Sequence, residues 1–248
     1  MPDKLHKTKG IVLRTVKYGE TSLVVTLFTE LFGAQAYIVN SIRTVSRKGN
    51  SKAAHFQPAA ILDLVVYHNE LRHLHRIREF RWAYLYQHIY SDVPRNAVAL
   101  FMMELLGKCL KQPEANPDLF YFTEDVLEAL DRSEGTVMAN LPLFFALQLP
   151  VHFGFRIGDN PGDGNRYLDL QEGTYVPEQP VHPHFLEPAD AAVVALILKV
   201  MQPEELATIP LGHDQRRRIL HRLEPYYAMH IQDFGTLRSL PVLREVLG

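Results

Sequence analysis

Residues 9–39 read KGIVLRTVKYGETSLVVTLFTELFGAQAYIV, and this stretch decides the fold of the first part of the chain. It contains three runs that are rich in β-branched and aromatic residues, as strands are: residues 9–16, 22–29 and 34–39. The first run alternates, so Ile11 and Leu13 fall on one face of the predicted strand. Val12 and Arg14 fall on the other face.

Two further runs extend this strand pattern. Ala59–Tyr67 follows Pro58, and Leu74–Phe80 follows a turn-like segment at residues 68–70. A longer, polar and basic connection, Asn40–Lys52, separates the third run from the fourth. Five short strands in about 80 residues, with the long connection in that place, favour a small closed barrel of the OB type.

From residue 81 onward the apolar residues recur with the period of a helix. The predicted helices cover residues 82–90, 94–111, 118–132, 136–153, 189–201, 214–230 and 237–247. A glycine-containing segment at about residues 154–183 lacks this period and carries a small predicted hairpin. The fold class is therefore predicted as α+β with two domains. An OB-fold barrel occupies residues 1–81, and a helical domain with one short irregular insertion occupies residues 82–248.

The charge is distributed unevenly between these two parts. The whole chain of 248 residues has a formal net charge of only −2. Residues 1–81 contain 13 Lys and Arg against 6 Asp and Glu, a net of +7, whereas residues 82–248 have a net of −9. The basic domain is a candidate for polyanions, and the acidic domain is a candidate for protein partners.

Six cations of the predicted barrel give the strongest functional signal, and only Glu20 and Glu30 lie near them in the sequence. We expect these six to contact nucleic-acid phosphates: Arg14, Lys17, Arg43, Arg47, Lys48 and Lys52. OB barrels hold single strands with such cations and stack the bases on exposed aromatic rings. The aromatic candidates here are Tyr18, Tyr37 and Phe56. The alternative interpretation is a solvated charged loop, but the scarcity of acidic residues favours polyanion binding.

A second basic cluster lies in the predicted helix 214–230. It consists of Arg216, Arg217, Arg218 and Arg222. Arg218 and Arg222 share a helix face because they are four residues apart. This cluster is either a solvated helix side or a contact for an anion or an acidic peptide.

The sequence shows no catalytic motif, since GxSxG, HExxH and Walker patterns are absent, so no enzyme is predicted. His68, His73 and His75 cluster, and His182 and His184 form a pair, but no acidic residue stands at the spacing of a metal site. We interpret them as surface or core histidines. A metal-dependent hydrolase that uses the first cluster is the alternative.

The single cysteine, Cys109, excludes an intramolecular disulfide and a zinc site with several cysteine ligands. Residues 1–10 are polar and basic with no apolar run behind them, so we expect a cytoplasmic protein. Residues 135–155 carry no charge over 21 positions, about the length of a membrane span. Two prolines and several polar residues in this stretch instead predict a buried core helix. The loop 158–165 fits neither an EF-hand nor a phosphate-binding loop, and we interpret it as a turn.

Several segments of the chain together resemble a known family. They are Lys9–Thr15, Tyr18–Thr21, Val25–Thr29 and Phe32-Gly33, followed by the basic connection and Gln57-Pro58. They resemble the N-terminal signature of the bacterial recombination mediator family RecO. The helical part is similar to the family in layout, with a Gly154-Phe155 step and a late helix that is rich in basic and aromatic residues.

The resemblance implies a non-enzymatic DNA-repair protein that binds single- and double-stranded DNA and anneals complementary strands. Its implied partners are RecR, the single-strand-binding protein SSB and, indirectly, RecA. The acidic tail of SSB needs a basic, apolar pocket, for which the cluster Arg216–Arg222 is the candidate. Many members carry a four-cysteine zinc module after the Gly-Phe step, but residues 158–180 contain no cysteine, so we expect no cofactor. An RNA-binding OB adaptor is the alternative function.

Overall fold

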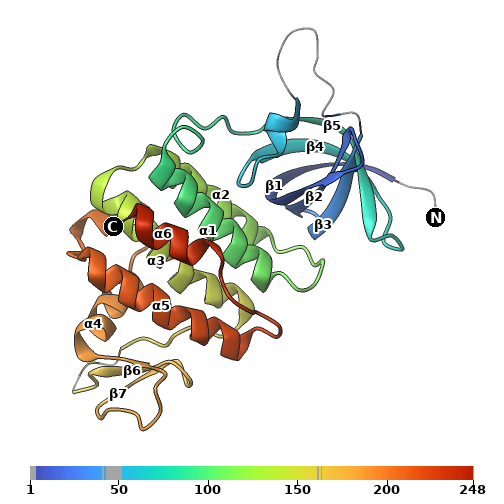
Figure 1. The fold of residues 1–248 in the computed structure, drawn as a ribbon. Helices are drawn as coiled ribbons and strands as arrows, with labels where there is room; N and C mark the ends of the chain where they lie inside the picture. The colour runs from blue at the N-terminus through green and yellow to red at the C-terminus, as the bar shows by residue number, and fades with distance from the viewer. Residues whose placement is uncertain (1–3, 41, 43–51, 161, 163, 248) are drawn as a thin grey trace. The chain divides into compact units, whose positions relative to one another are not determined.

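Five strands close into a barrel in the computed structural model, which describes residues 4–40, 42, 52–160, 162 and 164–247 (Figure 1). They are β1 (Lys4–Tyr18), β2 (Ser22–Thr29), β3 (Gly33–Val39), β4 (Ile61–His68) and β5 (Leu74–Trp82). The strands pair in the order β1-β2-β3-β5-β4, and β4 returns to β1. The β3–β5 pair is parallel and the other pairs are antiparallel. This five-stranded barrel confirms the predicted OB-type architecture.

Strict alternation fails at one point in β1. The register of β1 against β2 shifts between Val12 and Arg14, which is a β-bulge. Because the bulge adds one residue, Ile11, Val12 and Leu13 are all buried, while Arg14 is exposed. The prediction that Val12 and Arg14 share a face is therefore wrong.

The interior of the barrel is filled by alternate residues of the strands. Leu23, Val25 and Leu27 of β2 point into this core, so Ser22, Val24 and Thr26 point outward. A short 3₁₀ helix, η1 (Lys52–Phe56), precedes β4 and buries the Phe56 ring in the same core.

The barrel belongs to a compact unit that also includes residues 110–127. This segment contains the first part of helix α2 (Pro117–Arg132). The Phe120 ring lies 5.6 Å from that of Phe28, centroid to centroid. The Lys9 ammonium donates to the Glu124 carboxylate, with 2.8 Å between Nζ and Oε1. Helical periodicity does not say what a helix packs against, so the sequence pattern did not indicate that residues 110–127 belong with the barrel.

The other compact unit comprises residues 88–109 and 128–248. Its remaining helices are α1 (Val93–Cys109), α3 (Gly135–Gln148), η2 (Leu149–Phe153), α4 (Pro188–Ile197), η3 (Pro203–Thr208), α5 (His213–His230) and α6 (Ser239–Val246). The predicted helix at 82–90 does not form. The backbone N–H groups of His88 and Ile89 instead donate to the Asp131 carboxylate, at 2.8 and 3.0 Å.

The uncharged stretch forms α3 and η2, and Gly135–Phe153 is long and apolar enough to cross a membrane by length and composition alone. In the structure all side chains from Asn140 to Leu147 are buried within the unit. The Asn140 amide donates to the main-chain oxygens of Leu206 and Ile209. This burial confirms the predicted core helix.

The irregular segment forms a small sheet of three strands in the order β7-β6-β8. They are β6 (Tyr167–Asp169), β7 (Thr174–Val176) and β8 (Phe185–Leu186). The pairing of β6 with β7 confirms the predicted hairpin, and β8 adds a strand that the sequence pattern did not indicate.

Candidate nucleic-acid interface

The strand register builds a continuous outward face over β1, β2, β3 and β5. Residues that lie opposite each other across these strands form rows on it. The rows, in strand order, are Arg14-Thr26-Ala36-Leu74 and Val16-Val24-Ile38-Arg76. At the end of β1, Tyr18 lies opposite Ser22. We call these two rows, with Tyr18 and Ser22, the outer face.

Small and apolar side chains occupy the middle of the outer face, and cations stand at its margins. Arg14 is exposed on the β1 side, and Arg76 is exposed on the β5 side. The described residues that form the outer face include no carboxylate. An apolar floor between cationic margins suits a single strand, because its bases are apolar on their faces and its phosphates are anionic.

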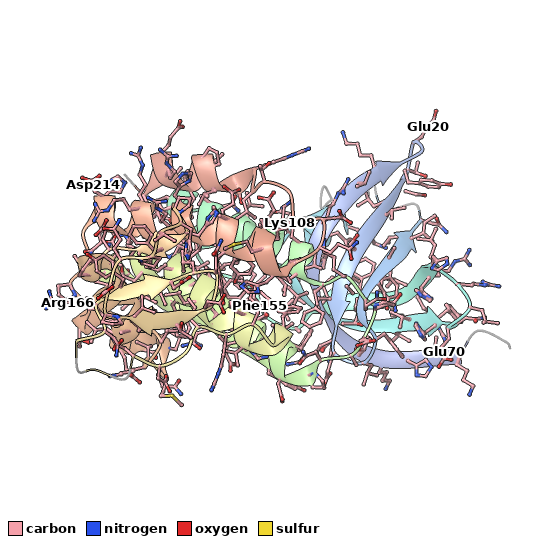
Figure 2. All side chains as sticks on the ribbon, turned by 90° about the horizontal axis from the view of Figure 1, so that it is seen from below. Glu20, Glu70, Lys108, Phe155, Arg166 and Asp214 are labelled. Atoms are coloured by element: carbon pink, nitrogen blue, oxygen red, sulfur yellow. The ribbon has the colours of Figure 1, made fainter. Side chains whose placement is uncertain are left out.

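OB folds bind oligonucleotides on the face of strands 2 and 3, between the loop that joins strands 1 and 2 and the loop that joins strands 4 and 5. In this barrel both loops are the turns of hairpins. Glu20 marks the tip of the β1–β2 hairpin, and Glu70 lies in the β4–β5 hairpin (Figure 2). The Tyr18 side chain, beside the first tip, is 57% exposed. Tyr18 is therefore placed where a base can stack on it.

Lys52 extends the basic margin on the β5 side. It lines a pocket of about 290 Å³ together with Val39, Asn40, Ile42, Arg76, Ile77, Arg78 and Phe80. The structure thus brings Lys52 together with two arginines that sequence reasoning did not select, Arg76 and Arg78. The signal that points to them is an arginine at alternate positions of a strand, since such positions share a face.

The six predicted phosphate contacts are only partly located. Arg14 lies on the outer face, and Lys17 is exposed near the end of β1. Lys52 lies beside Arg76 and Arg78. Arg43, Arg47 and Lys48 lie outside the described residues. The contact of all six with phosphates stays a prediction.

Two of the three aromatic candidates are not available for stacking on bases. Tyr37 is 0% and Phe56 is 1% exposed, and both lie in the barrel core. Burial raises the pKa of the Tyr37 phenol well above its usual range. Sequence alternation alone left open which of the three aromatic residues is exposed, and of these three only Tyr18 is exposed in the structure.

The described histidines are held by neighbouring side chains rather than arranged around a common point. His68 and His75 stack ring on ring, with centroids 4.5 Å apart, so their nitrogens do not converge on one point. His182 Nε2 lies 3.1 Å from the Asp169 carboxylate. In the part of the chain that the structure describes, no group of three or more His, Cys, Asp or Glu side chains is placed to hold a metal ion. The geometry gives no support to the hydrolase alternative.

The segment after Gly154-Phe155 does not fit a four-cysteine zinc site, since it contains no thiolate. The Asp169 carboxylate organises this segment instead. It accepts hydrogen bonds from the backbone N–H groups of Gln171 and Glu172, at 2.8 and 3.3 Å. The small sheet is thus held by hydrogen bonding and packing.

The second basic cluster divides into two pairs. The Arg218 guanidinium binds both oxygens of the buried Asp190 carboxylate, at 3.0 and 3.2 Å. Arg222 donates to the main-chain oxygen of Pro183. Arg216 and Arg217 instead line a small pocket between α3, α5 and α6, with Ala139, His213, Leu220, Leu243, Arg244 and Leu247.

Arg216 is held at the edge of this pocket by neutral groups. It donates to the Asn140 side-chain oxygen at 3.1 Å and to the main-chain oxygen of Leu211 at 2.6 Å. Its buried Nε makes no hydrogen bond within the described residues, and burial lowers the pKa of its guanidinium. The pocket is therefore basic and apolar, but its volume is only about 20 Å³, so it suits an acidic ligand that lies across its surface rather than one that inserts a side chain.

The chain matches two family models in succession. Residues 1–86 match the model described as Recombination protein O N terminal, and residues 90–241 match Recombination protein O C terminal. It is also similar over nearly its full length to proteins named DNA repair protein RecO. The relative from Flavobacterium psychrophilum is 30% identical over 98% of this chain and 99% of its own length. The relative from Phocaeicola vulgatus is 28% identical over 98% of this chain and 100% of its own length. The chain belongs to the RecO family of DNA repair proteins.

Proposed function

We propose that this protein is a non-enzymatic recombination mediator. It binds single- and double-stranded DNA, promotes the annealing of complementary strands and, together with RecR, helps to load RecA onto SSB-coated DNA. The observation that carries the DNA-binding step is the outer face, with its apolar middle and cationic margins. The function requires no cofactor, and its place is the cytoplasm. Elemental analysis of the purified protein tests the expectation that it holds no metal.

The outer face acts through charge and shape rather than through chemistry. Cations such as Arg14 and Arg76 neutralise phosphates and release counterions, so affinity falls as salt rises. Contacts to the phosphates carry no sequence information, so binding has little sequence preference. Annealing requires two anionic strands to approach each other, and a basic surface screens their mutual repulsion.

Fluorescence anisotropy with a labelled oligonucleotide tests this function. We expect binding to weaken strongly between about 50 and 200 mM salt, as it does for proteins that make several phosphate contacts. Absent or salt-independent binding contradicts the proposal. Reversal of Arg43, Arg47 and Lys48 to Glu tests the contacts that lie outside the described residues, and we expect it to abolish binding without unfolding the protein. Competition with RNA separates this function from an RNA-binding adaptor, which would prefer RNA.

For the SSB contact, the structure favours the pocket beside Arg216 over the whole predicted cluster. A peptide with acidic residues and an apolar C-terminal residue matches its guanidinium groups and its leucines. We expect Arg217→Glu and Arg244→Glu each to weaken the binding of such a peptide at least tenfold. Arg222→Ala is the matched control, since Arg222 donates to Pro183 and does not line the pocket. Equal loss in all three variants contradicts this assignment.

A further inference from the structure

A pocket of about 340 Å³ lies at one end of the outer face, beside the β4–β5 hairpin. Its lining residues come from β3, β4, β5 and the hairpin: Ile38, Tyr67, Asn69, Arg72, Leu74, His75 and Arg76. None of these described residues carries a carboxylate. Ligand pockets commonly measure about 300–1,000 Å³, so this one suits a single small ligand.

The floor of the pocket follows from the strand register. Arg76 lies opposite Ile38 of β3 and opposite Tyr67 of β4, so these three side chains form one outward row. Leu74, two residues earlier on β5, points to the same side and is 42% exposed. The floor is thus apolar and aromatic, with a guanidinium in its middle.

The hairpin supplies the wall of the pocket. The Asn69 side-chain oxygen accepts a hydrogen bond from the N–H of Leu71 at 3.0 Å. The main-chain oxygen of Asn69 accepts one from the N–H of Arg72, also at 3.0 Å. These two hydrogen bonds fix the conformation of the turn. The turn carries Arg72, which lines the pocket together with Arg76. Two guanidinium groups thus line one pocket, and guanidinium groups donate hydrogen bonds to phosphate oxygens in a geometry that fits them well.

We propose that this pocket binds one unstacked nucleotide of a DNA strand. The base lies against Ile38, Tyr67 and Leu74, and its phosphate is held by Arg72 and Arg76. This inference rests on the proposed function, since the strand that supplies the nucleotide crosses the outer face. The row Val16-Val24-Ile38-Arg76 connects that face directly to the pocket floor.

Nuclear magnetic resonance of the full-length protein tests the pocket with three probes: thymidine monophosphate, thymidine and inorganic phosphate. We expect the monophosphate to shift the methyl signals of Ile38 and Leu74 in a saturable way. An unlabelled oligothymidylate should displace it. Thymidine and phosphate should each bind at least fivefold more weakly, because each supplies only half of the contacts.

Arg76→Ala should weaken binding of the monophosphate at least fivefold, while Arg81→Ala should leave it unchanged. Arg81 is the matched control because it lies on the same strand, pairs with Asp63 and does not line this pocket. The inference is overturned if oligothymidylate binds the protein but the monophosphate shifts neither methyl signal. Equal effects of the two substitutions, or equal affinity for phosphate alone, also overturn it. In these cases the proposed function stands, whereas an absence of oligothymidylate binding removes both.

Discussion

His68 and His75 stack on each other inside one end of the barrel, with ring centroids 4.5 Å apart and planes inclined by 26°. Phe32 also stacks on His68, at 3.9 Å. The Nδ1 atom of His68 is buried and makes no hydrogen bond within the described chain. Burial lowers the pKa of His68, the imidazole of His6 lowers it further, and Glu70 acts in the opposite direction.

We expect the barrel unit to lose stability as the pH falls below about 6.5, the ordinary pKa of histidine. The unfolded chain then binds a proton that the folded His68 resists, so protonation favours unfolding. The contribution is complete above the unfolded pKa and is lost as the pH falls toward the lower, folded pKa. Urea unfolding followed by the fluorescence of Trp82, the single tryptophan, measures this. His68→Phe should flatten the dependence, with exposed His73→Gln as control; an unchanged pH slope in His68→Phe contradicts this explanation.

The margins of the outer face should each contribute to DNA affinity. We expect Arg14→Ala and Arg76→Ala each to weaken oligonucleotide binding and to lower the salt slope by about 0.7, the value for one contact to a single strand. The double variant should lose about twice as much slope. Anisotropy titrations at several salt concentrations measure this. Lys7→Ala is a suitable control, because Lys7 is exposed on β1 but lies outside the rows of the outer face; a slope change as large as that of Arg14→Ala would refute the assignment.

The Lys9–Glu124 pair should stabilise the attachment of residues 110–127 to the barrel. Both carboxylate oxygens of Glu124 accept from Lys9 Nζ, at 2.8 and 3.1 Å, and the Glu124 side chain is only 8% exposed. Lys9→Met leaves this carboxylate buried without its donor, which should cost about 1–3 kcal/mol of the free energy of unfolding. The double variant Lys9→Met/Glu124→Leu should recover much of that loss, since it removes both charges. No recovery in the double variant would mean that the pair itself is not the cause.

Gly33 should tolerate no side chain, for two separate reasons. Its φ is +63°, and a β-carbon built there would lie 2.1 Å from the main-chain oxygen of Glu114. Gly19 has a similar φ of +60° but has no atom within 4 Å of that position. Gly19→Ala should therefore cost only about 1–2 kcal/mol for the left-handed conformation, and Gly33→Ala clearly more. Urea unfolding of both variants measures the loss in the free energy of unfolding. Equal losses in the two variants would show that the backbone at Glu114 shifts at little cost to make room for the added methyl group.

Local sequence patterns predicted most of the elements, because strands and helices leave a period that can be read in the residues themselves. The register between paired strands cannot be read from one strand alone, because it depends on the partner strand. The bulge after Val12 rotates Arg14 to the outside, and pairing with β2 reveals it where alternation alone does not. For the same reason, alternation left open which of Tyr18, Tyr37 and Phe56 are exposed, and the structure shows that Tyr37 and Phe56 are buried.

The candidate site was predictable in part. Charge composition identified the basic domain, and Arg14 lies on its outer face. Arg72, Arg76 and Arg78 were not selected, since a cation within a strand pattern indicates an interface only when its neighbours across the strands are known. The sequence also did not show that Arg218 is paired while Arg216 and Arg217 line a pocket. The reason is that Asp190, which binds Arg218, lies 28 residues away in the sequence.

The path of the chain limits how the barrel unit can be truncated or exchanged with that of a relative. The polypeptide leaves the barrel unit after Gln87, returns at Leu110 and leaves again after Leu127. No single continuous segment that ends at residue 87 therefore contains the whole barrel unit. A fragment that ends at residue 87 would lose the Phe120 ring that packs on Phe28 and the carboxylate that binds Lys9. Exchange of the barrel unit with that of a relative therefore requires residues 110–127 to be exchanged together with residues 1–87.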